Sequence, residues 1–564
     1  MTKQNSQDPS LSWPKLRLRP GLRLDGWTIG AGAIGLIVLA PIVSVIWIAF
    51  HPTENIWPHL MASVLPRYLG NTLILMFGVA VLTAVFGVIA AWLVAMYQFP
   101  GRRWLDYGLL FPLAIPAYVG AYALVDFLDY AGPLQAAMRA TFGWADARAY
   151  WFPEVRARGP AIVVLASALY PYVYLLARAA FREQSGSSYE VARALGAGPL
   201  ALFWRVGVPL ARPAIATGVA LAMMETVADY GTVLHFGVQT LTTGVFSTWL
   251  SGNNAGGAAQ IAGVILMLIL LLMGLERVGR RRARFHGLSR ASQPIALHRL
   301  RGGWAALATV FCLLPFAIGF VLPVCVMIGH AVRRPDVWAA PGLLGALGNT
   351  VLVGGFAAVL TVGAAVFLVY GTRLIGRDFA RFVLPATALG YAAPGAVLAL
   401  GLLIPLAAVD HRVADAVFWV TGHDPGLVFT GTAAAIVLAY FVRFFGIAQG
   451  AVDAAFGRVS PSLSMAARSL GRSASGTLRD VYMPLMRGSV GTALLLVFVD
   501  CVKELPATLL LRPFNFNTLS TRVFELASLE RLGEAAPAAL LVMVVGLIAV
   551  AILAHTNRLR EIPE

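Results

Sequence analysis

Charged side chains are scarce in this sequence. Asp, Glu, Lys and Arg together make up 12% of the 564 residues, whereas hydrophobic residues make up 59%. The charged share is about half of that in a typical soluble domain, so a soluble globular fold is excluded. There are only three lysines, Lys3, Lys15 and Lys503, and none lies in the Gly-Lys-Ser/Thr context of a phosphate-binding loop. We therefore expect that this chain does not hydrolyse ATP.

Cysteine is also rare, and clusters of metal ligands are missing. Cys312, Cys325 and Cys501 each lie in an apolar segment, where they predict packing rather than a disulfide framework. No His and carboxylate residues occur at metal-ligand spacing, so the sequence identifies no metal ligand. A convergent His, Asp or Ser constellation is lacking as well, which disfavours an integral-membrane enzyme.

Long apolar stretches are abundant. A membrane span requires about 20 mainly apolar residues, and we expect twelve such spans. Because lipid offers no partner to unpaired backbone groups, the expected fold is an all-α integral membrane protein. The 56 glycines suit close packing of helices in lipid. The candidate spans lie near 27–50, 68–97, 105–128, 158–182, 206–235, 258–275, 304–329, 346–371, 380–407, 428–456, 486–511 and 537–555.

The net charge of +16 is concentrated outside the apolar stretches. The positive-inside rule places such basic segments in the cytoplasm, where they also meet anionic lipid, and it disfavours a nucleic-acid partner. We expect a cytoplasmic tail at 1–26, a cytoplasmic linker at 277–303 and a second cytoplasmic tail at 557–564. The linker contains eight arginines without an acidic residue among them: Arg277, Arg280, Arg281, Arg282, Arg284, Arg290, Arg299 and Arg301.

One sequence pattern occurs twice. The first copy is Glu190-Val-Ala-Arg-Ala-Leu-Gly196 followed by Val206-Gly-Val-Pro209, and the second is Met465-Ala-Ala-Arg-Ser-Leu-Gly471 followed by Val481-Tyr-Met-Pro484. The glycine precedes the proline by 13 residues in both. Leu69-Gly-Asn-Thr72 likewise returns as Leu347-Gly-Asn-Thr350, and Pro116 returns as Pro394, each 278 residues later. The chain therefore consists of two parallel six-helix repeats, 27–276 and 304–556, with a pathway expected at their pseudo-twofold axis.

Each copy of the pattern predicts a helix, a sharp break and a second helix on the cytoplasmic surface. Val191 to Leu195 forms the first helix, and Gly196 permits the break because glycine tolerates positive φ. Pro199 suits the first turn of the second helix, which continues to Trp204. We expect Pro209 and Pro213 to mark the return into the membrane.

These paired loops resemble the cytoplasmic EAA loops of ABC-importer permeases, onto which the ATPase subunits dock. The resemblance implies two copies of a cytoplasmic ABC ATPase, which would bind ATP and Mg²⁺, and a periplasmic solute-binding protein. The second copy departs from the family pattern, because Met465 replaces the glutamate found at Glu190. The residues that the resemblance assigns to ATPase coupling are Glu190, Ala192, Gly196, Pro209, Ala466, Ala467, Gly471 and Pro484.

Several charged residues fall inside the candidate spans. Each costs roughly 2.5–3.5 kcal/mol at a helix centre, so each should face a pathway or a partner. Glu225 and Asp500 both follow their loop proline by 16 residues. Three interpretations remain open: a charged gate or cation-contacting wall, structural pairing between helices, and misplaced span boundaries that leave these groups in water. The candidate pathway residues are Glu225, Asp229, Tyr230, Asp500, Lys503 and Glu504. Tyr170, Tyr172 and Tyr174 with Arg178 are weaker candidates, because tyrosines are more common at the membrane interface.

A narrower resemblance covers nearly the whole chain. Tyr170-Pro-Tyr-Val-Tyr-Leu-Leu-Ala-Arg178, Glu225-Thr-Val-Ala-Asp-Tyr-Gly231, Phe236-Gly-Val-Gln-Thr240 and Lys503-Glu-Leu-Pro-Ala-Thr508 are similar to the fused permeases of bacterial ferric-iron ABC importers. The resemblance implies a permease of the bacterial inner membrane that works by ATPase-driven alternating access. Thiamine and polyamine permeases have a similar layout and remain alternatives. A secondary transporter of two six-helix halves and a structural membrane scaffold are the competitors from other classes.

Overall fold

The computed structural model describes residues 25–184, 186–281 and 297–560. Most of the predicted N-terminal tail, residues 561–564 of the predicted C-terminal tail and most of the Arg-rich linker therefore lie outside the described residues. Within those ranges the fold is all-helical apart from one two-residue strand pair. The elements of the first half are α1 (Gly26–Phe50), α2 (Trp57–Ala62), α3 (Leu65–Met96), β1 (Tyr97–Gln98), α4 (Arg102–Gly108), η1 (Phe111–Ala114), α5 (Ala117–Leu128), α6 (Pro133–Phe142), α7 (Arg158–Glu183), α8 (Gly186–Ala194), α9 (Pro199–Leu202), η2 (Phe203–Gly207), α10 (Val208–Ala228), α11 (Gly231–His235), α12 (Leu241–Phe246), η3 (Ser247–Ser251) and α13 (Ala255–Arg281).

The second half repeats this order. Its elements are β2 (His298–Arg299), α14 (Gly303–Phe316), η4 (Ala317–Val321), α15 (Leu322–Arg333), η5 (Pro335–Ala339), α16 (Leu343–Ile375), α17 (Arg377–Thr387), α18 (Leu389–Ala392), α19 (Gly395–Thr421), α20 (Ala433–Arg458), α21 (Pro461–Ser469), α22 (Ala474–Thr477), η6 (Leu478–Tyr482), α23 (Met483–Lys503), α24 (Pro506–Leu511), α25 (Leu519–Ser528) and α26 (Leu532–Arg560).

Eleven helices of the described chain are long and apolar enough to cross a membrane, and a bent pair raises the number to twelve. Each predicted span has a counterpart among them, which confirms the all-helical membrane fold. The bent pair is the predicted span 105–128, in which the segments Arg102–Ala114 and Ala117–Phe142 meet at 95°. Pro116 lies at the bend with φ −59° and ψ 137°. Its ring disfavours helical geometry in the residue before it and removes a backbone donor, so the helix ends there.

The bounds of the predicted spans 206–235, 380–407 and 486–511 are wrong, because each range crosses a break in the helix. In the second half, α18 ends before Pro394, which begins α19 in the same extended geometry as Pro116. The helix α10 ends at Ala228, and α11 begins after Asp229 and Tyr230. Its counterpart α23 ends at Lys503, and α24 begins after Glu504 and Leu505. The helix breaks therefore recur at equivalent places in the two halves.

The two halves interlock rather than lying side by side as separate domains. The first helix of the chain, α1, packs against α16 and α19 of the second half, and α15 packs against α5 of the first half. Trp27 stacks on Phe367 with ring centroids 4.6 Å apart. The glycine-rich packing is visible where Val173 of α7 fits between Gly87 of α3 and Gly218 of α10, since a Cβ at either glycine would lie 2.7 Å from Val173. The predicted halves are therefore sequence repeats that share one helical core.

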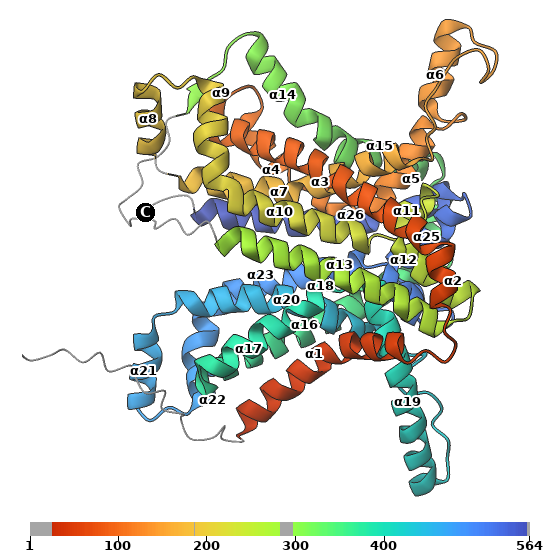
Figure 1. Ribbon diagram of the computed structural model, residues 1–564, viewed down its shortest axis with the longest axis vertical. Coiled ribbons are helices and arrows are strands. Elements are labelled where there is room, and N and C mark those ends of the chain that lie inside the picture. Colours follow the sequence, from red (N-terminus) through yellow and green to blue (C-terminus); the bar gives the residue numbers. More distant parts are fainter. Residues whose placement is uncertain (1–24, 185, 282–296, 561–564) are drawn as a thin grey trace, which may run out of the picture.

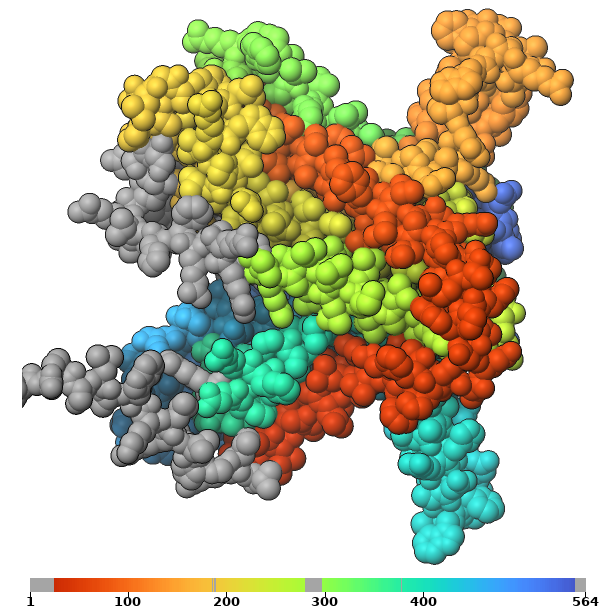
Figure 2. Space-filling view, in the orientation of Figure 1, coloured from red at the N-terminus to blue at the C-terminus, as the bar shows by residue number. Residues whose placement is uncertain are grey.

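The two ends of the molecule carry different features. The segments α8, α9, α21 and α22 lie at one end of the molecule, which we call the coupling face. The start of α1 and the C-terminal ends of α13 and α26 lie at the same end (Figure 1). That arrangement requires an even number of crossings per half, as predicted, and a cytoplasmic orientation of this face stays a prediction. At the opposite end, α6 and the far part of α19 project away from the helical body (Figures 1 and 2).

A short strand pair joins the end of the linker to the first half. Tyr97 pairs with His298 and Gln98 with Arg299 in parallel register. The all-α prediction did not include this pair. The strand pair fixes the chain just before α14, so the second half begins at the coupling-face end of α3.

Candidate functional site

The two predicted coupling loops adopt the expected helix–break–helix geometry. In the first, α8 is separated from α9 by Gly196, whose φ is +84°. In the second, α21 is separated from α22 by Gly471, whose φ is +83°. This left-handed conformation is available to glycine at little cost. A Cβ at either glycine would meet nothing within 4 Å, so the backbone conformation, and not crowding, requires glycine there.

Pro209 and Pro213 do not interrupt the helix in which they lie, and their role as the point of return into the membrane stays a prediction. The chain runs as one continuous helix from Pro199 to Ala228. A π-helical turn, η2, precedes Pro209, and the matching turn η6 precedes Pro484. The wider turn accommodates a proline, which lacks the backbone N–H of an ordinary helical position. Each coupling segment is consequently the first part of the membrane helix that lines the centre of the molecule.

Apolar side chains project from both coupling segments. Leu195 and Leu470 occupy equivalent positions and are 82% and 84% exposed. Glu190 and its replacement Met465 are both exposed as well. The alanines differ: Ala466 is exposed, Ala192 is half-buried and Ala467 is buried. A pair of exposed leucines at the tips is the kind of surface that a groove on a partner protein covers.

An aromatic cluster attaches the first coupling segment to the membrane helices. Trp92 of α3 contacts Phe181 of α7, Tyr189 of α8 and Phe203 of η2, with ring centroids 5.2, 5.9 and 5.3 Å away. The ring also fills the space beside Gly207, where a Cβ would collide with it. Because the cluster joins four elements, a shift of α8 is transmitted to α3 and α7.

The second half builds the same attachment with different residues. Tyr370 replaces the tryptophan and contacts Phe456 and Tyr482, with centroids 5.8 and 5.6 Å away. Its hydroxyl donates to the carbonyl of Ala474 in α22 at 2.7 Å. Tyr482 occupies the position equivalent to Gly207. In the first half, a tryptophan on α3 packs against a glycine on η2. In the second half, a tyrosine on α16 packs against a tyrosine on η6.

All six strong pathway candidates surround one cavity between the halves. The cavity has a volume of about 150 Å³. Tyr172 lines it too, whereas Tyr170, Tyr174 and Arg178 do not. Tyr170 and Tyr174 are instead fully buried among helices, and Arg178 pairs with Asp106 at 2.9 Å. The charged and hydroxyl-bearing residues around the cavity are Tyr118, Tyr172, Glu225, Asp229, Tyr230, Tyr391, Arg443, Asp500, Lys503 and Glu504.

Two of the carboxylates hold the broken helices. Glu225 and Asp229 are four residues apart and would share one face of a continuous helix, but α10 ends at Ala228, before Asp229. Its carboxylate accepts hydrogen bonds from the Thr232 hydroxyl at 2.8 Å and the Val233 amide at 3.1 Å, at the start of α11. Glu504 accepts from the amides of Ala507 and Thr508, each at 3.1 Å, at the start of α24. Each carboxylate supplies the acceptor that the helix break removed from the backbone.

The other two carboxylates participate in contacts between the halves. Glu225 of the first half accepts a hydrogen bond from the Tyr391 hydroxyl of the second half at 3.3 Å. Asp500 pairs with Lys503 at 3.0 Å, and Lys503 donates to the Leu113 carbonyl of the first half at 3.2 Å. Leu113 and Tyr391 are equivalent positions at the 278-residue offset. One cross-half contact therefore lies on each side of the pseudo-twofold axis.

Sequence reasoning missed Arg443 and Tyr391. Arg443 of α20 lies 3.7 Å from Glu504, whose side chain is 1% exposed. The space for this pair exists because residue 395 is glycine, where a Cβ would collide with the Glu504 carboxylate. An arginine within an apolar span was a usable signal, since an intramembrane charge is expensive unless it is paired. Tyr391 gave no signal, since tyrosines are common in membrane helices.

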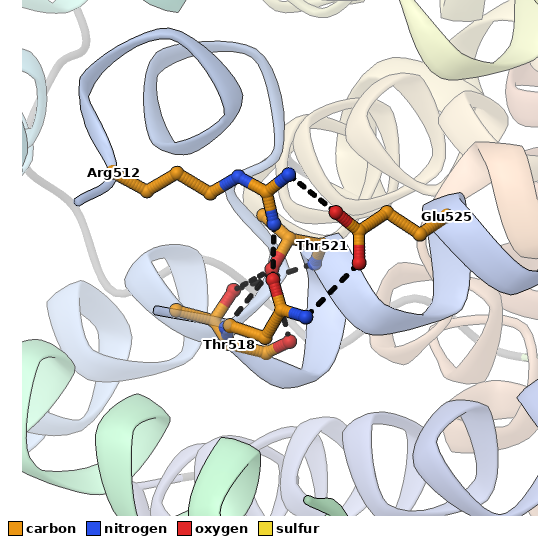
Figure 3. Close-up of polar contacts among 5 residues, drawn as sticks. Arg512, Thr518, Thr521 and Glu525 are labelled. Carbon is orange, nitrogen blue, oxygen red and sulfur yellow. Dashed lines mark hydrogen bonds and ion pairs between the residues drawn. The ribbon is translucent and has the colours of Figure 1, made fainter. Parts of the chain in front are cut away.

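The repeated Leu-Gly-Asn-Thr motif fixes the segment that follows each broken helix. Asn71 donates to the Gln239 carbonyl at 2.8 Å, and Thr72 accepts from the Leu241 amide at 3.0 Å. In the second half, Asn349 donates to the Asn517 carbonyl and Thr350 accepts from the Leu519 amide. The second-half segment carries an additional network in which Arg512 pairs with Glu525 beside the Thr518 and Thr521 capping box (Figure 3). The motif thus sets where α12 and α25 begin.

The aromatic attachment predicts a rescue experiment. Gly207→Ala places a methyl group against the Trp92 ring, so we expect overpacking that destabilises the protein by about 1–3 kcal/mol and lowers the melting temperature. Adding Trp92→Tyr, the residue that the second half uses, should restore most of the loss. Gly274→Ala is the control, because a Cβ there meets nothing within 4 Å. Equal melting of Gly207→Ala and wild type would contradict this account of the cluster.

Known proteins show similarity to this chain. Residues 83–285 match the family described as "Binding-protein-dependent transport system inner membrane component". The chain is 26% identical over 479 residues to the Fe(3+)-transport system permease protein FbpB 2 of Haemophilus influenzae, an alignment that covers 84% of this chain and 87% of that protein. It is 28% identical over 208 residues to the molybdenum transport system permease protein ModB of Escherichia coli K12, covering 35% of this chain and 87% of ModB. A probable sulfate transport system permease protein cysT of Nephroselmis olivacea is 29% identical over 204 residues, covering 34% and 67%.

The broken central helices, the paired surface segments and these relatives agree with one another. The protein is a multi-pass permease, the non-catalytic membrane subunit of an ABC importer, and its residues 83–285 match the family of binding-protein-dependent transport system inner membrane components.

Proposed function

We propose that this permease imports ferric iron. The observation that carries the proposal is the acidic lining of the central cavity. Four carboxylates and two cationic groups line it: Glu225, Asp229, Asp500 and Glu504 against Arg443 and Lys503. With all six groups ionised, the lining has an excess of two negative charges, which favours a cation and disfavours an oxyanion.

The relatives differ in how much of this chain they match. The ferric-iron permease is similar over most of this chain, whereas the molybdenum and sulfate permeases are similar over about a third of it. A molybdate or sulfate ion would meet the carboxylates of both halves at the centre. Among the described residues, no group of three or more His, Cys, Asp or Glu is arranged to hold a metal ion. This suits passage without tight binding, because an ion held strongly in the pathway would leave slowly.

The cross-half contacts support a gating role for Glu225 and Lys503. In the conformation described here, Tyr391 and Leu113 bind those residues across the interface. For an ion to pass, both contacts must separate, and Glu225 then becomes free to face the ion. Asp229 and Glu504 stay bound to α11 and α24 throughout, so the helix ends keep their shape while the halves move.

The coupling segments transmit the motion of the ATPase to the membrane helices. Two copies of an ABC ATPase, carrying ATP and Mg²⁺, would cover the exposed Leu195 and Leu470 and move them when the ATPase dimer closes. Each segment continues into the helix that carries Glu225 or Asp500, and the aromatic clusters join it to its neighbours. A displacement of the segments is therefore transmitted directly to the two cross-half contacts. A periplasmic solute-binding protein would deliver the ion.

The substrate is tested by uptake into proteoliposomes that contain the permease and its ATPase, with ATP inside and the solute-binding protein outside. Labelled ferric iron should accumulate, and labelled molybdate and sulfate should not. Unlabelled thiamine and spermidine should not compete. Uptake of any of these other solutes at the expense of iron would overturn the assignment.

The carboxylates have separable roles, which neutralising substitutions reveal. Glu225→Gln should leave the melting temperature within a degree or two of wild type and reduce iron uptake at least tenfold, because a stable fold does not require the charge. Asp229→Ala should lower the melting temperature first, because it leaves buried amide and hydroxyl donors of α11 unpaired at about 1–3 kcal/mol each. Full uptake by a stable Glu225→Gln variant would remove that residue from the pathway.

The two loop glycines predict a graded effect on coupling. Gly196→Leu and Gly471→Leu should each reduce iron uptake and ATPase co-purification several-fold, since a branched side chain at positive φ costs on the order of 1–2 kcal/mol. Asn at the same positions is the matched control, because asparagine adopts this conformation more readily. Glu190→Ala should impair uptake more than Met465→Ala, as only the first removes a charge. Normal coupling in both leucine variants would contradict the assigned geometry.

A further inference from the structure

The two cationic residues of the central cavity both belong to the second half. Arg443 lies within α20, and Lys503 is the last residue of α23. At the 275-residue offset between the halves they correspond to Ala168 and Ala228, which line the cavity as well. The shared backbone plan therefore requires no positive charge at either position, and both charges are peculiar to the second half.

The surrounding structure holds these two cations differently. Lys503 pairs with Asp500 at 3.0 Å and donates to the Leu113 carbonyl at 3.2 Å. The Nη1 atom of Arg443 lies 3.7 Å from the Glu504 carboxylate, beyond hydrogen-bond distance, and is buried without a hydrogen-bond partner among the described residues. A buried N–H group without an acceptor is unfavourable. The guanidinium is therefore attracted to the carboxylate by its charge but is not fixed on it.

A glycine makes room for this guanidinium. A Cβ at Gly395 would collide with the Glu504 carboxylate and would lie 2.7 Å from Nη1 of Arg443. The equivalent residue of the first half, 278 positions earlier, is Ala117. That half also has the shorter Asp229 in place of the glutamate and no arginine. In the second half, the glycine thus leaves the space that the longer carboxylate and the guanidinium fill together.

Arg443 provides positive charge for carboxylates that have no other cation in the cavity lining. Lys503 neutralises its neighbour Asp500, and Arg443 is the only other cationic side chain that lines the described cavity. Arg443 pairs with Glu504 and also attracts Glu225 electrostatically. Such attraction is stronger in a protein interior than in water, because the effective dielectric constant is lower. The guanidinium therefore occupies the negative field in which an imported cation would bind.

We propose that Arg443 is the resident counter-cation of the empty cavity and sets the charge that an ion must carry to enter. The inference rests on the proposed function, because it requires a cation to pass between these carboxylates. Moving the guanidinium aside costs the same for every ion, whereas the attraction that an ion gains from the carboxylates rises in proportion to its charge. A side chain on a short stem also has a high effective concentration, so a free ion of equal charge does not displace it. Trivalent cations enter, and monovalent and divalent cations are kept out.

The resident cation also protects the cavity when no ion has been delivered. Once Tyr391 releases Glu225, this carboxylate is free for an ion or for the Arg443 guanidinium. In the absence of a trivalent ion, the guanidinium takes it up. An empty transport cycle therefore does not leave an open negative site for the abundant monovalent and divalent cations of the medium.

The test measures entry of Mn²⁺, a divalent ion, into proteoliposomes that contain the full permease–ATPase complex, with ATP inside and no solute-binding protein. The wild-type complex should exclude Mn²⁺. Arg443→Gln should raise Mn²⁺ entry about tenfold or more, because it removes a full charge at close range to the carboxylates. Arg443→Lys should exclude Mn²⁺ like wild type, because it keeps a tethered cation. Arg373→Gln is the matched control, since it breaks an arginine pair with Asp453 that lies outside the cavity lining.

Uptake of labelled ferric iron in the same vesicles, after the solute-binding protein is added outside, gives a second readout. Millimolar Mn²⁺ should inhibit iron uptake by the Arg443→Gln variant, because the divalent ion then competes for the carboxylates. Iron uptake by wild type and by Arg443→Lys should not respond to Mn²⁺. A merely structural arginine would lower the melting temperature without creating this competition.

Exclusion of Mn²⁺ by a stably folded Arg443→Gln variant would overturn the proposal. So would Mn²⁺ entry through an Arg443→Lys variant that melts like wild type. If Arg443→Gln does not assemble with the ATPase, Gly395→Ala takes its place, because the added Cβ crowds the guanidinium out of its position, and Mn²⁺ exclusion by that variant would contradict the proposal. If wild-type vesicles import no ferric iron with the solute-binding protein present, the proposed function fails, whereas the Mn²⁺ assay still decides the role of Arg443.

Discussion

The structure depends on how a membrane protein satisfies backbone groups where a helix is broken. Lipid provides no hydrogen-bond partners, so each amide freed at the start of α11 and α24 requires an acceptor from the protein. Asp229 and Glu504 supply it, and the Asn and Thr of the Leu-Gly-Asn-Thr motif bind the next segment of each half. With the breaks held in this way, α10 and α23 end beside the cavity.

The two halves use the same backbone plan with different charges. The first half contributes Glu225 and Asp229, and the second adds Lys503 and Arg443 to its own two carboxylates. Arg443 corresponds to no charged residue in the first half, where alanine occupies position 168. The same divergence occurs at the aromatic clusters, where tryptophan and glycine are replaced by two tyrosines. One chain carrying both repeats can keep such asymmetry, because each half is always paired with the other.

Sequence patterns predicted the parts of this structure that repeat. The fixed glycine-to-proline spacing located both coupling segments, and the matched acidic positions identified six residues that line one cavity. The helix breaks were missed although Asp229 and Glu504 lie at them, because mean hydropathy does not distinguish a continuous span from an interrupted one. Tyr391 and the compensation between Trp92 and Gly207 depend on which helices touch. Such contacts between distant segments leave no local pattern in one sequence.

The central claim is that the contacts between the halves open while the helix caps remain closed. The direct measurement is a structure of the permease bound to an ATPase variant that binds ATP without hydrolysing it. The account predicts that Tyr391 has separated from Glu225 and Lys503 from the Leu113 carbonyl, with Asp229 and Glu504 still bound to α11 and α24. Retention of both cross-half contacts in that state, or release of the caps instead, would contradict it.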